Sequence, residues 1–184
     1  MNSVEIILNE LQALAPQIQQ EQIEQMAQAI MNARHIFVVG AGRSGFCARG
    51  FSNRLLHLGF NVSFVGEPTT PRLLKEDLLL IASGSGKTGS LVSMANKAKE
   101  VGAQIGTFTI NPEATIGAMA NAVITIPGTT RLLGEDNNTQ LSVQPIGSAF
   151  EQLLWITFDA LIMELMKKTN QLPEDLISRH ANLE

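Results

Sequence analysis

Six consecutive residues near the middle of the chain combine hydroxyl groups and glycines at a spacing that suits an anion. They are Ser83, Gly84, Ser85, Gly86, Lys87 and Thr88. The hydroxyls and backbone N–H groups of such a loop can converge on a phosphate dianion without a metal, and glycine lets the backbone approach the anion closely. The sequence therefore predicts a phosphate-binding loop over 83–88, called the serine loop below. A glycine-rich turn that only begins a helix is the structural alternative.

A second glycine-rich segment, 40–45 (GAGRSG), is called the glycine loop. We expect Ser44 to hold the same anion and Arg43 to add positive charge. The segment fits the G-x-G-x-x-G pattern of dinucleotide-binding proteins, with Glu67 near the place of the ribose-binding acid. The chain is too short for the second half of that fold and a substrate domain. A P-loop requires glycine at position 81, where Ile81 stands. Two phosphate cradles on neighbouring strands remain the preferred interpretation.

Two further side chains suggest proton transfer. Glu151 lies in the first turn of a predicted helix that is otherwise strongly apolar. One carboxylate can remove a proton beside a ketone and return it to the neighbouring carbon. His180, near the C-terminus, can move protons between oxygens as a neutral imidazole. Glu151 could instead only stabilise the helix end, and His180 could be a solvated tail residue. A catalytic His180 requires the tail to dock, for example into a neighbouring subunit's site.

From residue 35 onward, short apolar runs alternate with helical stretches, which predicts a parallel sheet with helices on both faces. The expected strands are 36–39, 62–65, 78–82, 105–110 and 122–126. The expected helices are 3–15, 17–33, 44–58, 88–101, 113–120 and 147–169. Gly59 and Gly102 are expected to end two of these helices. Because ligands bind at the carboxyl ends of strands in such sheets, both loops are expected at one edge.

Composition and charge describe a folded protein. The chain has 184 residues, 45% hydrophobic and 16% charged, with a net charge of −4. This balance excludes a disordered protein, and the absence of a basic block argues against nucleic-acid binding. Cys47 is the only cysteine, so no intramolecular disulfide can form. No apolar run reaches the roughly 18 residues of a membrane-spanning helix, and no basic leader precedes Arg34. We expect a soluble cytoplasmic protein without metal or other cofactor.

Taken together, these motifs resemble the 6-phospho-3-hexuloisomerases, a family of sugar isomerase (SIS) domain proteins. The serine loop resembles the SIS signature. The likeness continues in the segments 42–44 (GRS), 54–59 (RLLHLG), 145–151 (PIGSAFE) and 179–184 (RHANLE). It extends from the first helices to the last residue. Lys87 departs from the family at a position that is often acidic, and the segment 129–140 matches nothing assignable.

The resemblance implies an α/β fold, a three-layer sandwich with a five-stranded parallel sheet in flavodoxin-like order. It implies one SIS domain over 1–184, with N-terminal helices over 3–33, a core over 35–169 and a tail over 170–184. It also implies a metal-free homotetramer that isomerises D-arabino-hex-3-ulose 6-phosphate to D-fructose 6-phosphate through an enediol, in formaldehyde fixation or pentose supply.

The alternatives are another SIS isomerase, acting on a pentose, heptose or amino-sugar phosphate, and a non-catalytic sugar-phosphate sensor. The segment 145–151 and the terminal Arg179-His180 pair argue against the first. The absence of a basic, DNA-binding helix argues against the second.

Overall fold

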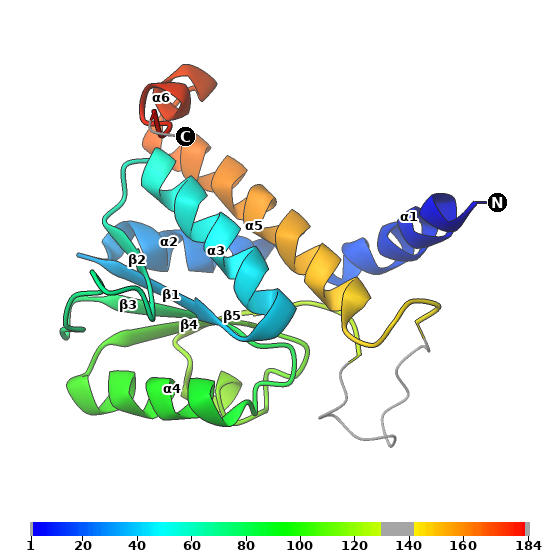
Figure 1. Ribbon diagram of the computed structural model, residues 1–184, viewed down its shortest axis with the longest axis horizontal. Coiled ribbons are helices and arrows are strands. Elements are labelled where there is room, and N and C mark those ends of the chain that lie inside the picture. Colours follow the sequence, from blue (N-terminus) through cyan, green and yellow to red (C-terminus); the bar gives the residue numbers. More distant parts are fainter. Residues whose placement is uncertain (1, 130–141, 183–184) are drawn as a thin grey trace.

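A computed structural model describes residues 2–129 and 142–182 (Figure 1). Five parallel strands form one sheet in the order β2-β1-β3-β4-β5. They are β1 (Ile36–Gly40), β2 (Val62–Phe64), β3 (Leu78–Ala82), β4 (Gln104–Thr109) and β5 (Ala122–Thr125). The five predicted strands and the flavodoxin-like order are confirmed. Most of the segment 129–140 lies outside the described residues.

Helices cover both faces of the sheet and make the molecule a three-layer sandwich (Figure 1). The longer helices of the molecule are α1 (Ser3–Leu14), α2 (Gln20–Asn32), α3 (Gly42–His57), α4 (Gly89–Val101) and α5 (Ser148–Thr169). α2 and α3 pack on one face with α5 against both, α1 contacts α5, and α4 covers the other face. Alternate strand residues serve the two layers, since Val38 packs toward α3 and Val39 toward α4. Gly59 and Gly102 have φ angles of 85° and 81°, as predicted for residues that end helices.

One predicted helix, 113–120, is wrong. The segment contains only a 3-10 turn over Gly117–Met119. Its backbone is held by tertiary contacts instead, because the N–H of Ile116 donates to the carbonyl oxygen of Gly86 at 3.0 Å. At the start of the segment, the N–H of Glu113 donates to the side-chain oxygen of Asn111 at 3.0 Å. Asparagine in such a turn offers the backbone an alternative to a helix.

A short helix that the sequence analysis missed, α6 (Pro173–Ser178), lies within the predicted tail. Its signals were present in the sequence, because proline favours the first helical position and acidic residues favour the first turn. Glu174 and Asp175 occupy that turn, and the side chain of Asp175 accepts a hydrogen bond from the N–H of Leu172 at 2.8 Å.

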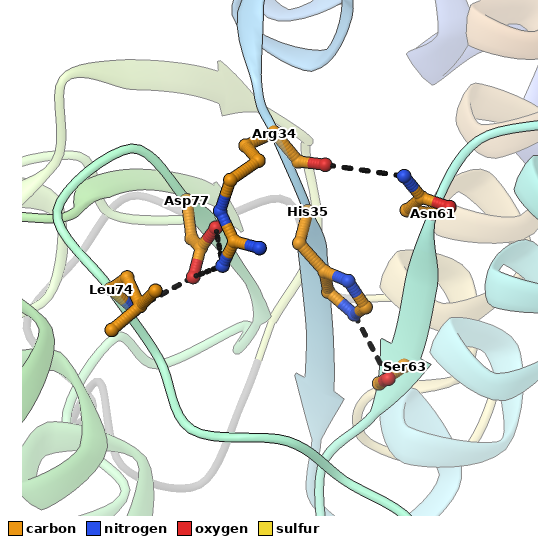
Figure 2. Close-up of polar contacts among 6 residues, drawn as sticks. All are labelled: Arg34, His35, Asn61, Ser63, Leu74 and Asp77. Atoms are coloured by element: carbon orange, nitrogen blue, oxygen red, sulfur yellow. Dashed lines mark hydrogen bonds and ion pairs between the residues drawn. The ribbon is translucent and has the colours of Figure 1, made fainter.

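At the amino edge of the sheet, a buried carboxylate ties the connection between β2 and β3 to the rest of the fold (Figure 2). Asp77 is fully buried. It accepts hydrogen bonds from the N–H of Leu74 at 2.7 Å and from Arg34 at 2.9 Å. Beside it, Nε2 of His35 lies 3.0 Å from Oγ of Ser63. This cluster is structural, because it lies at the edge opposite to the two loops.

Candidate active site

The glycine loop and the serine loop lie side by side at the carboxyl edge of the sheet. β1 and β3 are adjacent parallel strands, and Gly40 is paired with Ala82 in their register. The two loops follow these positions; α3 begins within the glycine loop, at Gly42, and α4 begins directly after the serine loop, at Gly89. The structure therefore brings the two predicted phosphate-binding segments together, as expected for loops that follow neighbouring parallel strands.

Close packing between strand and helix explains the glycines of the glycine loop. A Cβ atom on Gly45 would lie 2.7 Å from the carbonyl oxygen of Gly40, and one on Gly40 would lie 2.9 Å from Cα of Gly45. The G-x-G-x-x-G pattern thus follows from a tight turn. Glu67, the candidate ribose-binding acid, forms an ion pair with Arg49 at 2.5 Å. Ser44 is half-buried in the first turn of α3.

The serine loop contains a buried hydroxyl group that a ligand could satisfy. Ser83 is 3% exposed, and among the described residues its Oγ has no hydrogen-bond partner. Leaving a buried polar atom unsatisfied costs about 1–3 kcal/mol. A bound phosphate would remove that cost. Ser85, also buried, accepts a hydrogen bond from the N–H of Lys87 at 3.2 Å.

Neighbouring segments fix the backbone of the serine loop. The carbonyl oxygen of Gly84 accepts hydrogen bonds from the N–H of Ile110 at 3.0 Å and from Oγ1 of Thr109 at 3.2 Å. Gly86 has a left-handed φ of 63°. These contacts within the protein hold the loop in shape, which reduces the ordering that binding of an anion would require.

Lys87 and Thr88 end the serine loop at the start of α4. The Lys87 side chain is exposed. Thr88 is the N-cap residue of α4, yet its side chain makes no capping hydrogen bond. The hydroxyl of Thr88 is therefore not used to cap the helix. Phosphate binding by Lys87 and Thr88 stays a prediction.

Glu151 and Arg43 meet across the first turns of α5 and α3. Nε of Arg43 donates a hydrogen bond to Oε2 of Glu151, and the two form an ion pair. The Glu151 side chain is 15% exposed, whereas that of Arg43 is 69% exposed. The hydrogen bond to Glu151 and its negative charge raise the pKa of Arg43 above its ordinary value. The carboxylate is therefore fixed beside the glycine loop.

Cys47 makes a second contact between α3 and the turn that holds Glu151. Its Sγ donates to the backbone oxygen of Glu151 at 3.6 Å. Partial burial of the thiol, together with the nearby charge of Glu151, raises the pKa of Cys47. A raised pKa disfavours the reactive thiolate, so Cys47 acts by packing. No local signal could reveal this contact, because the two residues lie far apart in the sequence.

His180 lies far from Glu151 within one chain. It follows α6, which lies at the opposite end of α5 from the first turn (Figure 1). His57 lies 14 residues along α3 from Arg43, the partner of Glu151, which at a rise of 1.5 Å per residue corresponds to about 21 Å. The ring of His180 stacks on that of the buried His57, with centroids 4.7 Å apart. The chain by itself therefore does not bring the two candidate catalytic residues together.

The described part of the C-terminal tail is docked on the end of α3. Nη1 of Arg179 donates to the backbone oxygen of His57 at 3.1 Å and to Oε1 of Gln171 at 2.8 Å. Nε2 of Gln171 donates to the backbone oxygen of Leu58 at 2.9 Å. These bonds satisfy carbonyl groups at the C-terminus of α3 and give His180 a defined place.

A pocket that the sequence did not reveal opens at the β4 and β5 side of the same edge. It has a volume of about 370 Å³ and lies between α1 and the start of α5. Glu10, Gln17, Thr125 and Gly128 are among its lining residues. Gln144 donates to Glu10 at 2.9 Å beside it. Amphipathic periodicity predicted α1 as a helix, but not that the helix would reach this edge.

The described residues contain neither a metal-binding cluster nor a membrane-spanning helix. No group of three or more His, Cys, Asp or Glu side chains lies close enough together there to hold a metal ion. No helix in 2–129 or 142–182 is both long and apolar enough to cross a bilayer. The independence from metal remains a prediction.

The chain is similar over its whole length to known proteins. The SIS domain profile matches residues 29–135. A protein of Bacillus subtilis (strain 168), named 3-hexulose-6-phosphate isomerase, is 44% identical over 97% of this chain and 95% of its own length. A protein of the same name from Mycobacterium gastri is 39% identical over 100% of this chain and 90% of its own.

A solved structure is also similar in fold and in sequence. It is a hypothetical protein of Methanococcus jannaschii whose crystal structure was taken to infer a molecular function of 3-hexulose-6-phosphate isomerase. The similarity has a TM-score of 0.84 and 33% identity, and it covers 100% of both chains.

Proposed function

Because the chain belongs to the 3-hexulose-6-phosphate isomerase family of SIS-domain proteins, we propose that it converts D-arabino-hex-3-ulose 6-phosphate to D-fructose 6-phosphate. One observation carries the proposal. The carboxylate of Glu151, held by Arg43, lies at the same sheet edge as a serine loop with the buried, unsatisfied hydroxyl of Ser83. A phosphate holder and a positioned base are what a sugar-phosphate isomerase requires.

In the proposed reaction, Glu151 is the general base. Its carboxylate takes the proton from C2 of the substrate, which the C3 ketone acidifies. The C–H electron pair forms the C2–C3 double bond of an enediol, and the C3 carbonyl oxygen gains a proton. The same carboxyl group then returns its proton to C3. The O2 hydroxyl becomes the new carbonyl by giving its proton to His180, which replaces the proton that His180 gave to O3. Atoms and electrons balance without an oxidant, so no redox cofactor is needed.

The substrate phosphate occupies the two adjacent loops. Its holders are Arg43, Ser44, Ser83, Gly84, Ser85, Gly86, Lys87 and Thr88. The N-terminus of α3 lies within the glycine loop and that of α4 directly follows the serine loop, and helix N-termini favour anions. The buried hydroxyl of Ser83 gains its hydrogen-bond partner when the phosphate binds.

His180 moves protons between O2 and O3, and it acts in a neighbouring copy of the chain. Within its own chain it stacks on His57, which lies about 21 Å along α3 from the Arg43 that holds Glu151. Two copies packed antiparallel along α5 would instead place each His180 at the other copy's Glu151. Such a pairing is isologous, the commonest interface in homo-oligomers.

Exposed apolar side chains mark the surface that this pairing would cover. Trp155 covers Gly50 beside Phe46, and Phe46 is 73% exposed. Met163 and Ile177 line a groove of about 360 Å³ that also contacts His180. Exposed apolar patches of this kind mark interaction sites. The outward face of α1 carries further exposed apolar residues, Val4 and Leu8 among them. It supplies a second interface, and the proposed assembly is a homotetramer.

The reaction is tested by a coupled assay. A synthase makes the substrate from formaldehyde and ribulose 5-phosphate, and fructose 6-phosphate is followed through glucose-6-phosphate isomerase and dehydrogenase. We expect turnover by the wild type and a loss of about 10²–10⁴-fold in Glu151→Gln, the usual contribution of one positioned base. Glu164→Gln, on the same helix and paired with Lys168, is the control and should keep its activity. Equal turnover in wild type and Glu151→Gln would remove Glu151 from the mechanism.

The crossed-subunit site is tested by mixing two inactive variants. Glu151→Gln and His180→Gln are each purified, unfolded together and refolded. If each site takes Glu151 from one copy and His180 from another, random assembly leaves about a quarter of the sites intact. Activity should therefore return to about that fraction of wild type. If both residues act within one chain, mixing restores nothing.

The proposed reaction also indicates the compartment and the pathway in which the protein works. The protein acts in the cytoplasm, in the ribulose monophosphate pathway, without a metal and without binding nucleic acid. Binding of sugar phosphates with no turnover of the hex-3-ulose 6-phosphate would favour the alternatives, another SIS isomerase substrate or a non-catalytic sensor.

A further inference from the structure

We infer that Arg43 is a positioning residue for the general base, an assignment that rests on the function proposed above. Its Nε–H holds one carboxylate oxygen of Glu151, Oε2. This leaves Oε1 as the oxygen that exchanges a proton with the substrate. Arg43 thus acts through Glu151, in addition to any attraction that its charge exerts on the substrate phosphate.

The surroundings of the second oxygen fit this assignment. Gly147 has a φ of 91°, and a Cβ atom there would lie 3.6 Å from Oε1. Glycine at this position leaves Oε1 uncovered. The two oxygens therefore have different environments, since one is bonded to Arg43 and the other lies beside a residue without a side chain.

Packing between α3 and α5 sets the distance that Arg43 spans. The ring of Phe51 stacks on that of Phe158, with centroids 4.3 Å apart and planes 6° apart. Nearer the site, a Cβ atom on Gly50 would lie only 2.6 Å from the ring of Trp155, so the glycine allows the two helices to approach closely. These contacts fix the two helices relative to each other. Arg43 therefore extends from a rigid backbone and can hold the carboxylate in one orientation.

The geometry favours positioning over simple phosphate anchoring. Guanidinium has a fixed, planar set of N–H donors, and lysine cannot reproduce it. Arg43 directs its Nε donor at a carboxylate on α5 and not at the serine loop. A residue that served only as a phosphate anchor would need no partner on the helix that carries the base.

A double-mutant cycle in the coupled assay tests the inference, using Arg43→Ala, Glu151→Gln and the double variant. A misplaced base costs about 10²-fold, so Arg43→Ala should lower kcat by about 10–100-fold while KM changes less. The double variant should be no slower than Glu151→Gln alone, because Arg43 acts through that carboxylate. Arg49→Ala, which removes an exposed ion pair from the same helix, is the control and should keep its kcat.

Chemical rescue separates positioning from bulk charge. Added guanidinium should restore kcat of Arg43→Ala in part, whereas ethylammonium and the Arg43→Lys substitution should not. Three results would overturn the inference: an unchanged kcat with a raised KM, losses that multiply in the double variant, or full rescue by lysine. Wild-type turnover with any of them would leave the proposed function intact. No turnover by the wild type would overturn both.

Discussion

Gly86 is the residue of the serine loop at which one added methyl group should disturb phosphate binding most. Its φ is 63°, a conformation that L side chains rarely adopt. A Cβ atom there would lie 2.7 Å from Cβ of Ala114 and 3.3 Å from Oγ1 of Thr109. Ala114 is buried and has no flexible side chain, so relief requires the backbone of one segment to move.

The expected cost of Gly86→Ala can be worked out from these two effects. Holding a residue with a Cβ atom in the left-handed region costs about 1–2 kcal/mol. Overpacking a well-packed site costs typically about 1–3 kcal/mol. The loop can escape part of this roughly 2–5 kcal/mol by shifting. A shifted loop no longer directs its N–H groups and hydroxyls at one phosphate.

Substrate KM and the competitive inhibition constant of inorganic phosphate are the quantities to measure. We expect both to rise at least about tenfold, which corresponds to 1.4 kcal/mol. The free energy of unfolding in urea should fall as well. Gly89→Ala is the matched control, because a Cβ atom there meets nothing within 4 Å and alanine is the better helix former. If Gly86→Ala matches Gly89→Ala in all three quantities, the role assigned to the serine loop is wrong.

The cluster at the amino edge of the sheet yields two predictions about stability (Figure 2). Asp77→Ala removes the buried acceptor of the Leu74 N–H and of Arg34. It should lower the free energy of unfolding by about 2–3 kcal/mol in urea titrations at fixed protein concentration, with kcat/KM unchanged; a large loss of activity would contradict the structural role. Burial lowers the pKa of His35 below its ordinary 6.5, against the opposing charge of Asp77. The folded state therefore resists protonation, and stability should fall as the pH drops below about 6.5. His35→Gln should flatten that fall, and an equally steep fall in the variant would exclude His35 as its source.

Local pattern was sufficient for the elements that carry the site. Short apolar runs identified the five strands, because strands buried on both faces need continuous apolar sequence. The two loops were located for the same reason, since each directly follows a strand. Gly59 and Gly102 were likewise predicted to end helices, and both have the left-handed φ angles that are typical of such glycines. The division into helices over 3–33, a core over 35–169 and a tail over 170–184 stays a prediction.

Local pattern failed where distant segments compete for the backbone. The segment 113–120 has helical sequence, yet the N–H of Ile116 is bonded to Gly86 in another part of the chain. A tertiary hydrogen bond of this kind overrides a weak local preference for helix. The prediction missed α6 for a different reason. The proline and the acidic residues that favour its first turn are present in the sequence, but the segment was assigned to the tail.

The sequence by itself determined the chemical groups of the candidate site: the serine loop, the glycine loop and a carboxylate at the start of an apolar helix. Only the tertiary structure decided which of them meet. Arg43 and Glu151 are 108 residues apart and touch because α3 and α5 pack side by side. Glu151 and His180 are much closer in sequence, yet His180 packs on His57, at the opposite end of α3 from Arg43. Periodicity and composition act over a few residues, whereas helix packing sets distances across the whole chain.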